Sequence, residues 1–219
     1  MAVAETSRRV LVVEPDSSTR REIRQACEQD GYQVVEADAG SEALRQIESS
    51  RPSVVLLEVT LPDTAGYDVC RELRKMDPAV PVIMMSSRSD EIDAVVALEI
   101  GADDYVTKPL RLRELVARMA AHLRRVRLEN AEAMRSRLEF RDLVIDVNER
   151  RTYKNNREVE LTHTEFDLLT FLASNAGKVL SREKILNSIW GYEYPIETRV
   201  IDVHIRNLRR KIETQPSRP

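Results

Sequence analysis

VVLLEVTLPDTAG, residues 54–66, is the stretch on which the fold depends. Its four leading aliphatic residues predict a strand buried on both faces, as in a parallel sheet covered by helices. Glu58 follows at the end of this strand, and Leu61, Pro62 and Gly66 shape the loop behind it. Ligands of open α/β sheets bind outside the carboxyl ends of the strands, so Glu58 stands where an active group is expected. A lone surface acid that ends a strand is the alternative interpretation.

Three other segments also run from apolar residues into polar ones. They are VLVVEPD (10–16), PVIMMSS (81–87) and ADDYVTKP (102–109). Segments of helical length and pattern separate them, and a further short strand is expected at 32–36. This alternation predicts an α/β domain, a doubly wound, five-stranded parallel sheet with right-handed crossovers.

Strand ends that offer acid, acid, hydroxyl and lysine in this order resemble the receiver domain of bacterial two-component response regulators. The resemblance covers residues 8–125. It implies that the pocket contains a phosphoacceptor, an acidic pair that holds magnesium, a switch hydroxyl, a switch aromatic residue and a phosphate-binding lysine. In this sequence those positions are Glu58, Glu14 with Pro15, Ser86, Tyr105 and Lys108, respectively.

Two of these positions depart from the family pattern. Pro15 has no carboxylate, so the metal site loses one ligand, and magnesium needs near-octahedral coordination at about 2.0–2.1 Å. Glu58 is one methylene longer than aspartate, which displaces its oxygens further than a preorganised site tolerates. We therefore expect no resident cofactor, with magnesium binding weakened, and no aspartyl phosphorylation of the usual kind. The alternative is a working phosphotransfer switch in which Asp16 completes the acidic pocket.

Two interpretations of Glu58 remain open. In the first, its carboxylate reaches Lys108 and Ser86 and partly imitates a phosphorylated aspartate, although it carries one negative charge instead of about two. In the second, the pocket has decayed, and the domain serves dimerisation or ligand sensing.

The resemblance also implies a dimerisation face formed by the fourth helix, the last strand and the fifth helix. Asp104 and Arg118 match one salt bridge of that face, and Glu114 matches another whose basic partner position is occupied by Ala94. We expect a homodimer through this face, weakened because exposed pairs contribute only about 0–1 kcal/mol each.

Composition and charge limit the class of protein. The chain has 219 residues, 42% of them hydrophobic and 32% charged, and no apolar run reaches the roughly 20 residues of a membrane span. The first residues, MAVAETSRR, lack the apolar core of an export signal, and Cys27 and Cys70 lie in helical patterns, so we expect a reduced, cytoplasmic protein. Residues 1–121 contain 15 Lys and Arg against 22 Asp and Glu (−7), whereas residues 122–219 contain 19 against 15 (+4). The basic second part is therefore the candidate for contact with a polyanion.

The second part begins after a predicted helical linker at 126–137. Four short β-type segments follow, at 138–140, 143–146, 151–154 and 158–161, with Asn155 and Asn156 as a turn that tolerates positive φ. Thr162 and Glu165 form a capping box at the start of one helix, and Ser181 begins another. The pattern predicts an α+β domain over residues 138–219.

The last helix, TRVIDVHIRNLRRKIE (198–213), has two faces. Ile201, Ile205, Leu208 and Ile212 predict its core stripe. The opposite face contains residue types that grip phosphate or read bases in the major groove: Arg199, Asp202, Val203, Arg206, Asn207 and Arg210. An ordinary amphipathic surface helix is the alternative. His204, beside the core stripe, is expected to be packed or to touch a phosphate rather than to bind a metal.

The order of strands and three helices resembles the winged-helix output domain of OmpR/PhoB-type regulators. This resemblance implies binding of double-stranded DNA at tandem repeats, with the last helix in the major groove, and a loop at 190–197 that faces RNA polymerase. The family continues into a C-terminal hairpin, the wing. This sequence stops at Pro219, so we expect either that it is a piece of a longer chain or that the wing is absent. We expect a DNA-binding transcription regulator rather than an enzyme. A receiver-mediated protein-interaction module without DNA binding is the remaining alternative.

Overall fold

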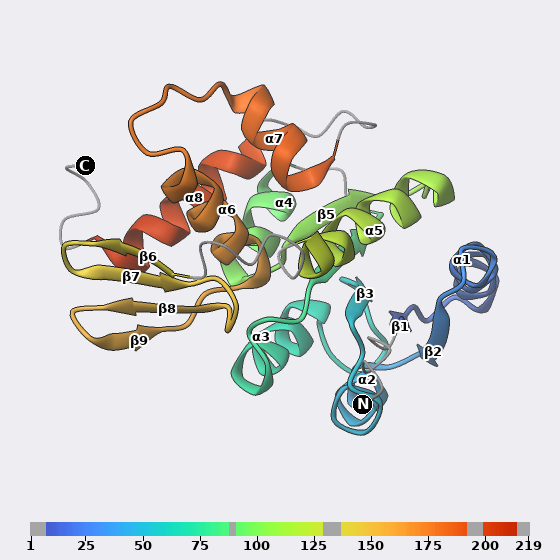
Figure 1. Ribbon diagram of the computed structural model, residues 1–219. Coiled ribbons are helices and arrows are strands. Elements are labelled where there is room, and N and C mark those ends of the chain that lie inside the picture. The colour runs from blue at the N-terminus through green and yellow to red at the C-terminus, as the bar shows by residue number, and fades with distance from the viewer. Residues whose placement is uncertain (1–7, 88–90, 129–136, 192–198, 214–219) are drawn as a thin grey trace, which may run out of the picture. The chain divides into compact units, whose positions relative to one another are not determined.

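The computed structural model describes residues 8–87, 91–128, 137–191 and 199–213. The chain divides into two compact units, Met1–Met119 and Ala120–Pro219, and each is described by itself below (Figure 1). Within the described residues, no helix is both long enough and apolar enough to cross a membrane.

The first unit alternates strands and helices. Its elements are β1 (Arg9–Val13), α1 (Ser17–Gln29), β2 (Gln33–Ala37), α2 (Gly40–Ser50), β3 (Val54–Glu58), α3 (Gly66–Met76), β4 (Val82–Ser86), α4 (Glu91–Ile100), β5 (Asp104–Thr107) and α5 (Leu112–Leu128), which continues into the second unit. All strand pairs are parallel, in the order β2-β1-β3-β4-β5. The predicted five-stranded, doubly wound sheet is therefore confirmed.

The strand order brings the polar strand ends together. The chain winds from β1 to β2 on one side and returns to β3 on the other, so the topological switch point, where such sheets bind ligands, lies between β1 and β3. Val13 is paired with Leu57, and Glu58 with Met85. Glu14 and Glu58 consequently leave the sheet at the same level, beside the end of β4.

The loop after β3 folds back on that strand. The backbone N–H of Gly66 donates to the carbonyl of Val59 (2.8 Å). A Cβ atom at Gly66 would lie 2.2 Å from the backbone oxygen of Glu58, so only glycine allows α3 to begin so close to the strand end. This requirement explains the glycine in the 54–66 stretch.

The start of α2 is capped from a distant part of the chain. The N-cap residue is Ala39, which makes no side-chain capping bond. The carboxylate of Asp63 instead accepts from the backbone N–H groups of Gly40 (2.8 Å) and Ser41 (2.9 Å). These bonds lower the pKa of Asp63 to about 2. Sequence periodicity cannot reveal a cap supplied from a loop more than 20 residues away.

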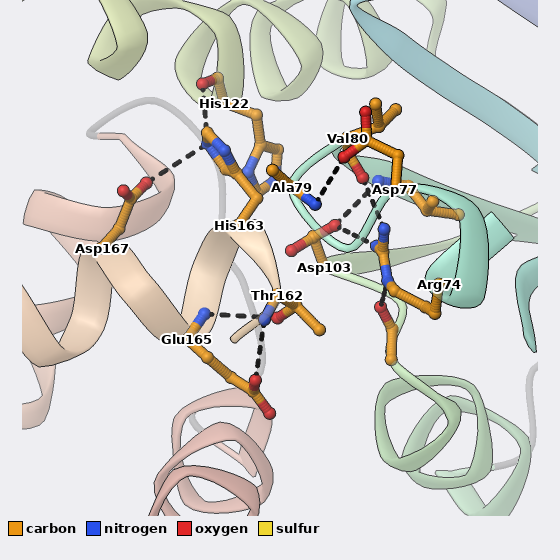
Figure 2. Close-up of polar contacts among 12 residues, drawn as sticks. Arg74, Asp77, Ala79, Val80, Asp103, His122, Thr162, His163, Glu165 and Asp167 are labelled. Atoms are coloured by element: carbon orange, nitrogen blue, oxygen red, sulfur yellow. Dashed lines mark hydrogen bonds and ion pairs between the residues drawn. The ribbon is translucent and has the colours of Figure 1, made fainter. Parts of the chain in front are cut away.

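Arg74, whose side chain is 10% exposed, braces the amino-terminal ends of two strands. Arg74 of α3 donates to the carbonyls of Gly101 (2.8 Å) and Val80 (2.6 Å) and forms an ion pair with Asp103 at 2.7 Å (Figure 2). Asp103 is fully buried and also accepts from the N–H of Val82 (2.8 Å). The contacts join α3 to the starts of β4 and β5.

Both cysteines are free and buried, as expected of a reduced protein. Burial raises the pKa of Cys27 to about 12 and that of Cys70 to about 11. Because the thiolate is the reactive form, both side chains are inert packing groups near neutral pH.

The second unit begins with an antiparallel sheet and continues with helices. The elements are β6 (Arg137–Phe140), β7 (Leu143–Asp146), β8 (Arg151–Lys154), β9 (Arg157–Val159), α6 (His163–Ser174), α7 (Arg182–Trp190) and α8 (Arg199–Ile212). Asn155 and Asn156 adopt φ of 50° and 62°, which confirms the predicted turn. The Thr162–Glu165 capping box is present (Figure 2), and Ser181 caps α7. The α+β prediction is therefore correct.

Three expectations fall on residues outside the described ranges. They are the rest of the helical linker beyond Leu128, most of the 190–197 loop expected to face RNA polymerase, and the chain end at 214–219. The division between the units falls within α5, after Met119, whereas the predicted receiver domain extends to residue 125.

Replacing Arg74 with alanine removes the guanidinium from the buried carboxylate of Asp103. We expect a loss of about 3–5 kcal/mol in the free energy of unfolding, because breaking a buried ion pair leaves a charge without its counterion. Urea unfolding followed by circular dichroism measures this loss. Arg71→Ala on the same helix is the control, since its pair with Asp68 is exposed and should contribute at most about 1 kcal/mol. Equal losses in the two variants would contradict the bracing role.

Asp63→Asn should destabilise the protein in a pH-dependent way. The pKa of Asp63 is lowered to about 2 in the folded chain, against about 3.9 when unfolded. Its contribution is therefore fully present above about pH 4 and disappears as the pH falls through about 2. In urea unfolding, the free energy of unfolding of Asp63→Asn should be lower than that of the parent chain by a constant amount from pH 7 to about 4. Below about pH 4 the difference should shrink. Glu22→Gln, an exposed change on α1, should show no such convergence.

Candidate functional site

Glu58 is the last residue of β3 and is only 4% exposed. One of its carboxylate oxygens accepts from the backbone N–H of Thr60 at 3.0 Å. The other lies 2.6 Å from Nζ of Lys108. Glu58 therefore reaches Lys108, as the first of the two interpretations expects, and it is not the lone surface acid of the alternative.

Lys108 lies between two carboxylates. Its Nζ is 2.6 Å from Glu58 and 2.7 Å from Oε2 of Glu14, which is 1% exposed. Burial acts to lower the pKa of Lys108, but the hydrogen bonds and charges of the two glutamates outweigh it, and the pKa is raised. The ammonium group therefore stays protonated and joins the ends of β1 and β3 to the residue that follows β5.

The residues around this lysine offer few free side-chain ligands for a magnesium ion. Pro15 offers no side-chain ligand, and Asp16 is the N-cap of α1, where its carboxylate accepts from the N–H of Thr19 at 2.8 Å. That capping bond is the main reason why the pKa of Asp16 is lowered. Among the described residues, no group of three or more His, Cys, Asp or Glu side chains is placed to hold a metal ion. The two carboxylates that remain are already bridged by the ammonium group.

Sequence reasoning missed a second cation beside this pocket. Arg20 of α1 donates to the backbone carbonyls of Glu14 (2.5 Å) and Pro15 (3.2 Å). It also lies 3.8 Å from Glu36 of β2. Arg20 thus fixes the backbone of the loop that contains Pro15. Its position one turn into α1 was the only sequence signal, and an arginine there is unremarkable.

The remaining predicted pocket residues lie on neighbouring strands. Ser86 is the last residue of β4 and is fully buried. Tyr105 lies in β5, half-buried against the hydrophobic core of the unit. Both side chains thus come from strands that end near Glu58, as the resemblance implied.

The residues predicted for the dimerisation face form a network inside one chain. Arg118 of α5 lies 3.0 Å from Asp104 and 2.6 Å from Glu114. Asp104 is fully buried, and Arg118 is 7% exposed. The pairing expected between subunits is therefore already satisfied within the chain for these three side chains.

In α8, the buried stripe differs from the predicted one. Asp202, Arg206 and Arg210 are exposed, as expected of a DNA-facing surface, but Val203 and Asn207 are buried at 6% and 5% exposure. The placement of Val203 and Asn207 on the free face is therefore wrong in this structure. The buried positions are 200, 201, 203, 204, 207 and 208, so the buried face is wider than predicted but includes Ile201 and Leu208 of the predicted stripe. Arg199 belongs to the helix, but its side chain is outside the described residues.

Two contacts fix α8 against α7. The ring of His204, 1% exposed, lies 5.5 Å from that of Trp190, so His204 is a packed residue as predicted. Asp202 lies 3.1 Å from the guanidinium of Arg182, the first residue of α7. This ion pair joins the two helices at their exposed starts, and sequence reasoning had not connected them.

Comparisons with known proteins agree with this geometry. Residues 10–120 match the family described as response regulator receiver domain, and residues 156–219 match transcriptional regulatory protein, C terminal. The chain is 44% identical to the probable transcriptional regulator ycf27 of Guillardia theta, over 98% of this chain and 86% of that protein. It is 40% identical to the DNA-binding response regulator MtrA of Mycobacterium tuberculosis, over 96% and 90%.

The solved structure of DrrB, an OmpR/PhoB homologue from Thermotoga maritima, is 34% identical, with a TM-score of 0.51 over 96% of this chain and 92% of that one. The receiver match alone covers half of the chain, and the curated relatives align along nearly all of it. The chain therefore belongs to the OmpR/PhoB-type response regulators, with an N-terminal receiver domain and a C-terminal transcriptional regulatory domain of the winged-helix class.

Proposed function

We propose that this chain is a DNA-binding transcription regulator whose receiver domain works without aspartyl phosphorylation. The observation that carries the proposal is the position of the Lys108 ammonium group, 2.6 Å from Glu58 and 2.7 Å from Glu14. Magnesium binding and phosphoryl transfer would both have to disrupt the ion pairs of Lys108 with Glu14 and Glu58. Both reactions are also disfavoured by the glutamate at the acceptor position and by the proline beside Glu14.

The ion pair supports the interpretation that Glu58 imitates a phosphorylated aspartate. The Lys108 ammonium group lies 2.6 Å from a carboxylate oxygen of Glu58, whose side chain is 5% exposed, so solvent screens the attraction between the two charges only weakly. A carboxylate carries one charge where an acyl phosphate carries about two, so the imitation is partial. In this proposal the receiver rests in an active-like state that no kinase needs to reach.

The partners follow from the second unit. The relatives whose names include DNA binding and transcriptional regulation share nearly the whole chain, and α8 exposes Arg206 and Arg210. We propose that α8 enters the major groove of double-stranded DNA and that homodimers formed through the receiver occupy tandem repeats, in the cytoplasm. RNA polymerase is the proposed partner of the segment between α7 and α8.

DNA binding should depend on Arg206. We expect Arg206→Ala to weaken binding by about 1–3 kcal/mol, because a guanidinium on the groove-facing side contacts base edges or phosphate. The measurement is an electrophoretic mobility shift with sequences selected from a random duplex pool, repeated at increasing salt. Arg137→Ala, which removes an exposed arginine from β6, should bind like the parent chain. Tight binding by Arg206→Ala, or no salt dependence in the parent chain, would favour a protein-interaction module instead.

The receiver should not accept a phosphoryl group. We expect no mass increase after incubation with acetyl phosphate and magnesium, and no beryllofluoride adduct, because the acidic pair and the acceptor are both altered. The double variant Pro15→Asp/Glu58→Asp restores the missing carboxylate and the shorter acceptor, so it should gain a magnesium-dependent adduct. A stable adduct on the unmodified receiver, mapped by peptide mass spectrometry, would instead establish a functioning phosphotransfer switch.

The same preparations decide what the Glu58–Lys108 pair does. Glu58→Gln keeps the shape of the side chain but removes the charge. If the pair holds the receiver in an active-like state, this variant should form fewer dimers in analytical ultracentrifugation and bind DNA more weakly. Unchanged dimerisation and DNA affinity would assign the pocket to a decayed receiver.

A further inference from the structure

The exposed side of α8 contains one acid among its bases. Asp202, Arg206 and Arg210 are spaced four residues apart and exposed, so they line up along one side of the helix. An uncompensated carboxylate on a surface that approaches DNA is repelled by the phosphates. The acid therefore needs either a base edge that donates to it or a cation that neutralises it.

The structure provides the cation. The guanidinium of Arg182 lies 3.1 Å from Oδ1 of Asp202 and donates a hydrogen bond to it. The two side chains are 64% and 54% exposed, so the pair lies on the outer surface of α7 and α8. Exposed pairs of this kind contribute little to folding, which leaves a role on the surface to explain.

The chemistry of arginine allows two partners at once. A guanidinium has five N–H donors in a rigid plane, and the contact with Asp202 uses a nitrogen at one edge. The remaining donors can bind a phosphate oxygen with the planar geometry that arginine favours. A lysine in the same place would lack this fork.

We propose that Arg182 contacts a DNA phosphate from outside α8, and that Asp202 positions this arginine instead of reading a base. This inference rests on the proposed DNA-binding function and assigns a residue of α7 to it. The arginine supplies a sequence-independent contact, and the aspartate holds the guanidinium plane toward the DNA. The earlier assignment of Asp202 as a direct DNA contact is replaced by a positioning role.

The test compares the parent chain with Arg182→Gln, Asp202→Asn and the double variant. The probe is a random-sequence duplex of about 30 base pairs, because phosphate contacts do not depend on sequence. Dissociation constants are measured from low to moderate salt. Arg182→Gln should make the slope of log K against log salt shallower by about 0.9, the value of one phosphate contact. Lys184→Gln, which removes an exposed cation from the same helix, is the matched control and should keep the slope.

The aspartate is tested through the sign of its effect. In the parent background, Asp202→Asn should weaken binding several-fold, because Arg182 loses its orientation, and Asp202→Glu should restore part of the affinity. In the Arg182→Gln background, Asp202→Asn should strengthen binding, because the carboxylate then only repels phosphate. The same strengthening in both backgrounds would overturn the positioning role.

Base readout gives a second and independent check. DNA selected from a random pool by Asp202→Asn should have the same consensus as DNA selected by the parent chain. A changed base preference at one position would make Asp202 a reader and overturn the inference. The proposed function fails separately, if the parent chain shows no salt-dependent binding or if Arg206→Ala leaves it intact. If those two controls behave as expected and Arg182→Gln keeps the parent slope, only the role of Arg182 fails.

Discussion

The receiver is organised around one ammonium group held by two carboxylates. Lys108 meets Glu14 and Glu58 at 2.7 and 2.6 Å, and these residues lie at or just beyond the ends of β5, β1 and β3. Two buried carboxylates so near each other would repel each other strongly in a medium of low dielectric constant. The lysine removes most of that repulsion, so the shape of the pocket depends on the lysine as much as on the acids. A metal ion would serve the same electrostatic need, and here the protein supplies its own cation.

The rest of the first unit keeps these three strand ends in place. At the carboxyl edge, Arg20 holds the Glu14–Pro15 backbone, and Asp63 caps α2 from the loop behind Glu58. At the amino edge, Arg74 ties α3 to the starts of β4 and β5 through the buried Asp103. Charged groups thus stabilise the sheet at both ends of its strands, whereas the interior of the sheet is aliphatic.

The second unit is stabilised by helix caps and by the packing of α8. A capping box and a serine cap start α6 and α7, and α8 buries a wide stripe that includes His204 beside Trp190. The width of that stripe explains why only some of the candidate DNA-facing residues are exposed. Asp202, Arg206 and Arg210 occupy the remaining side of the helix, and the ion pair with Arg182 extends this charged surface onto α7.

The sequence by itself determined the order of the elements, the parallel sheet, the two-part organisation and the family. Each of these rests on local patterns, since apolar runs, helical spacing and capping residues act within a few positions of each other. It also identified Glu58, Lys108 and Glu14, because parallel strands bring their carboxyl ends to one edge of the sheet. Only the tertiary structure decided that Lys108 bridges both acids and that Asp63 caps α2. It also decided that Asp16 caps α1 and that Val203 and Asn207 are buried. These outcomes depend on distances between groups that are far apart in the chain or on the rotation of a helix by a fraction of a turn, and neither quantity is encoded in local spacing.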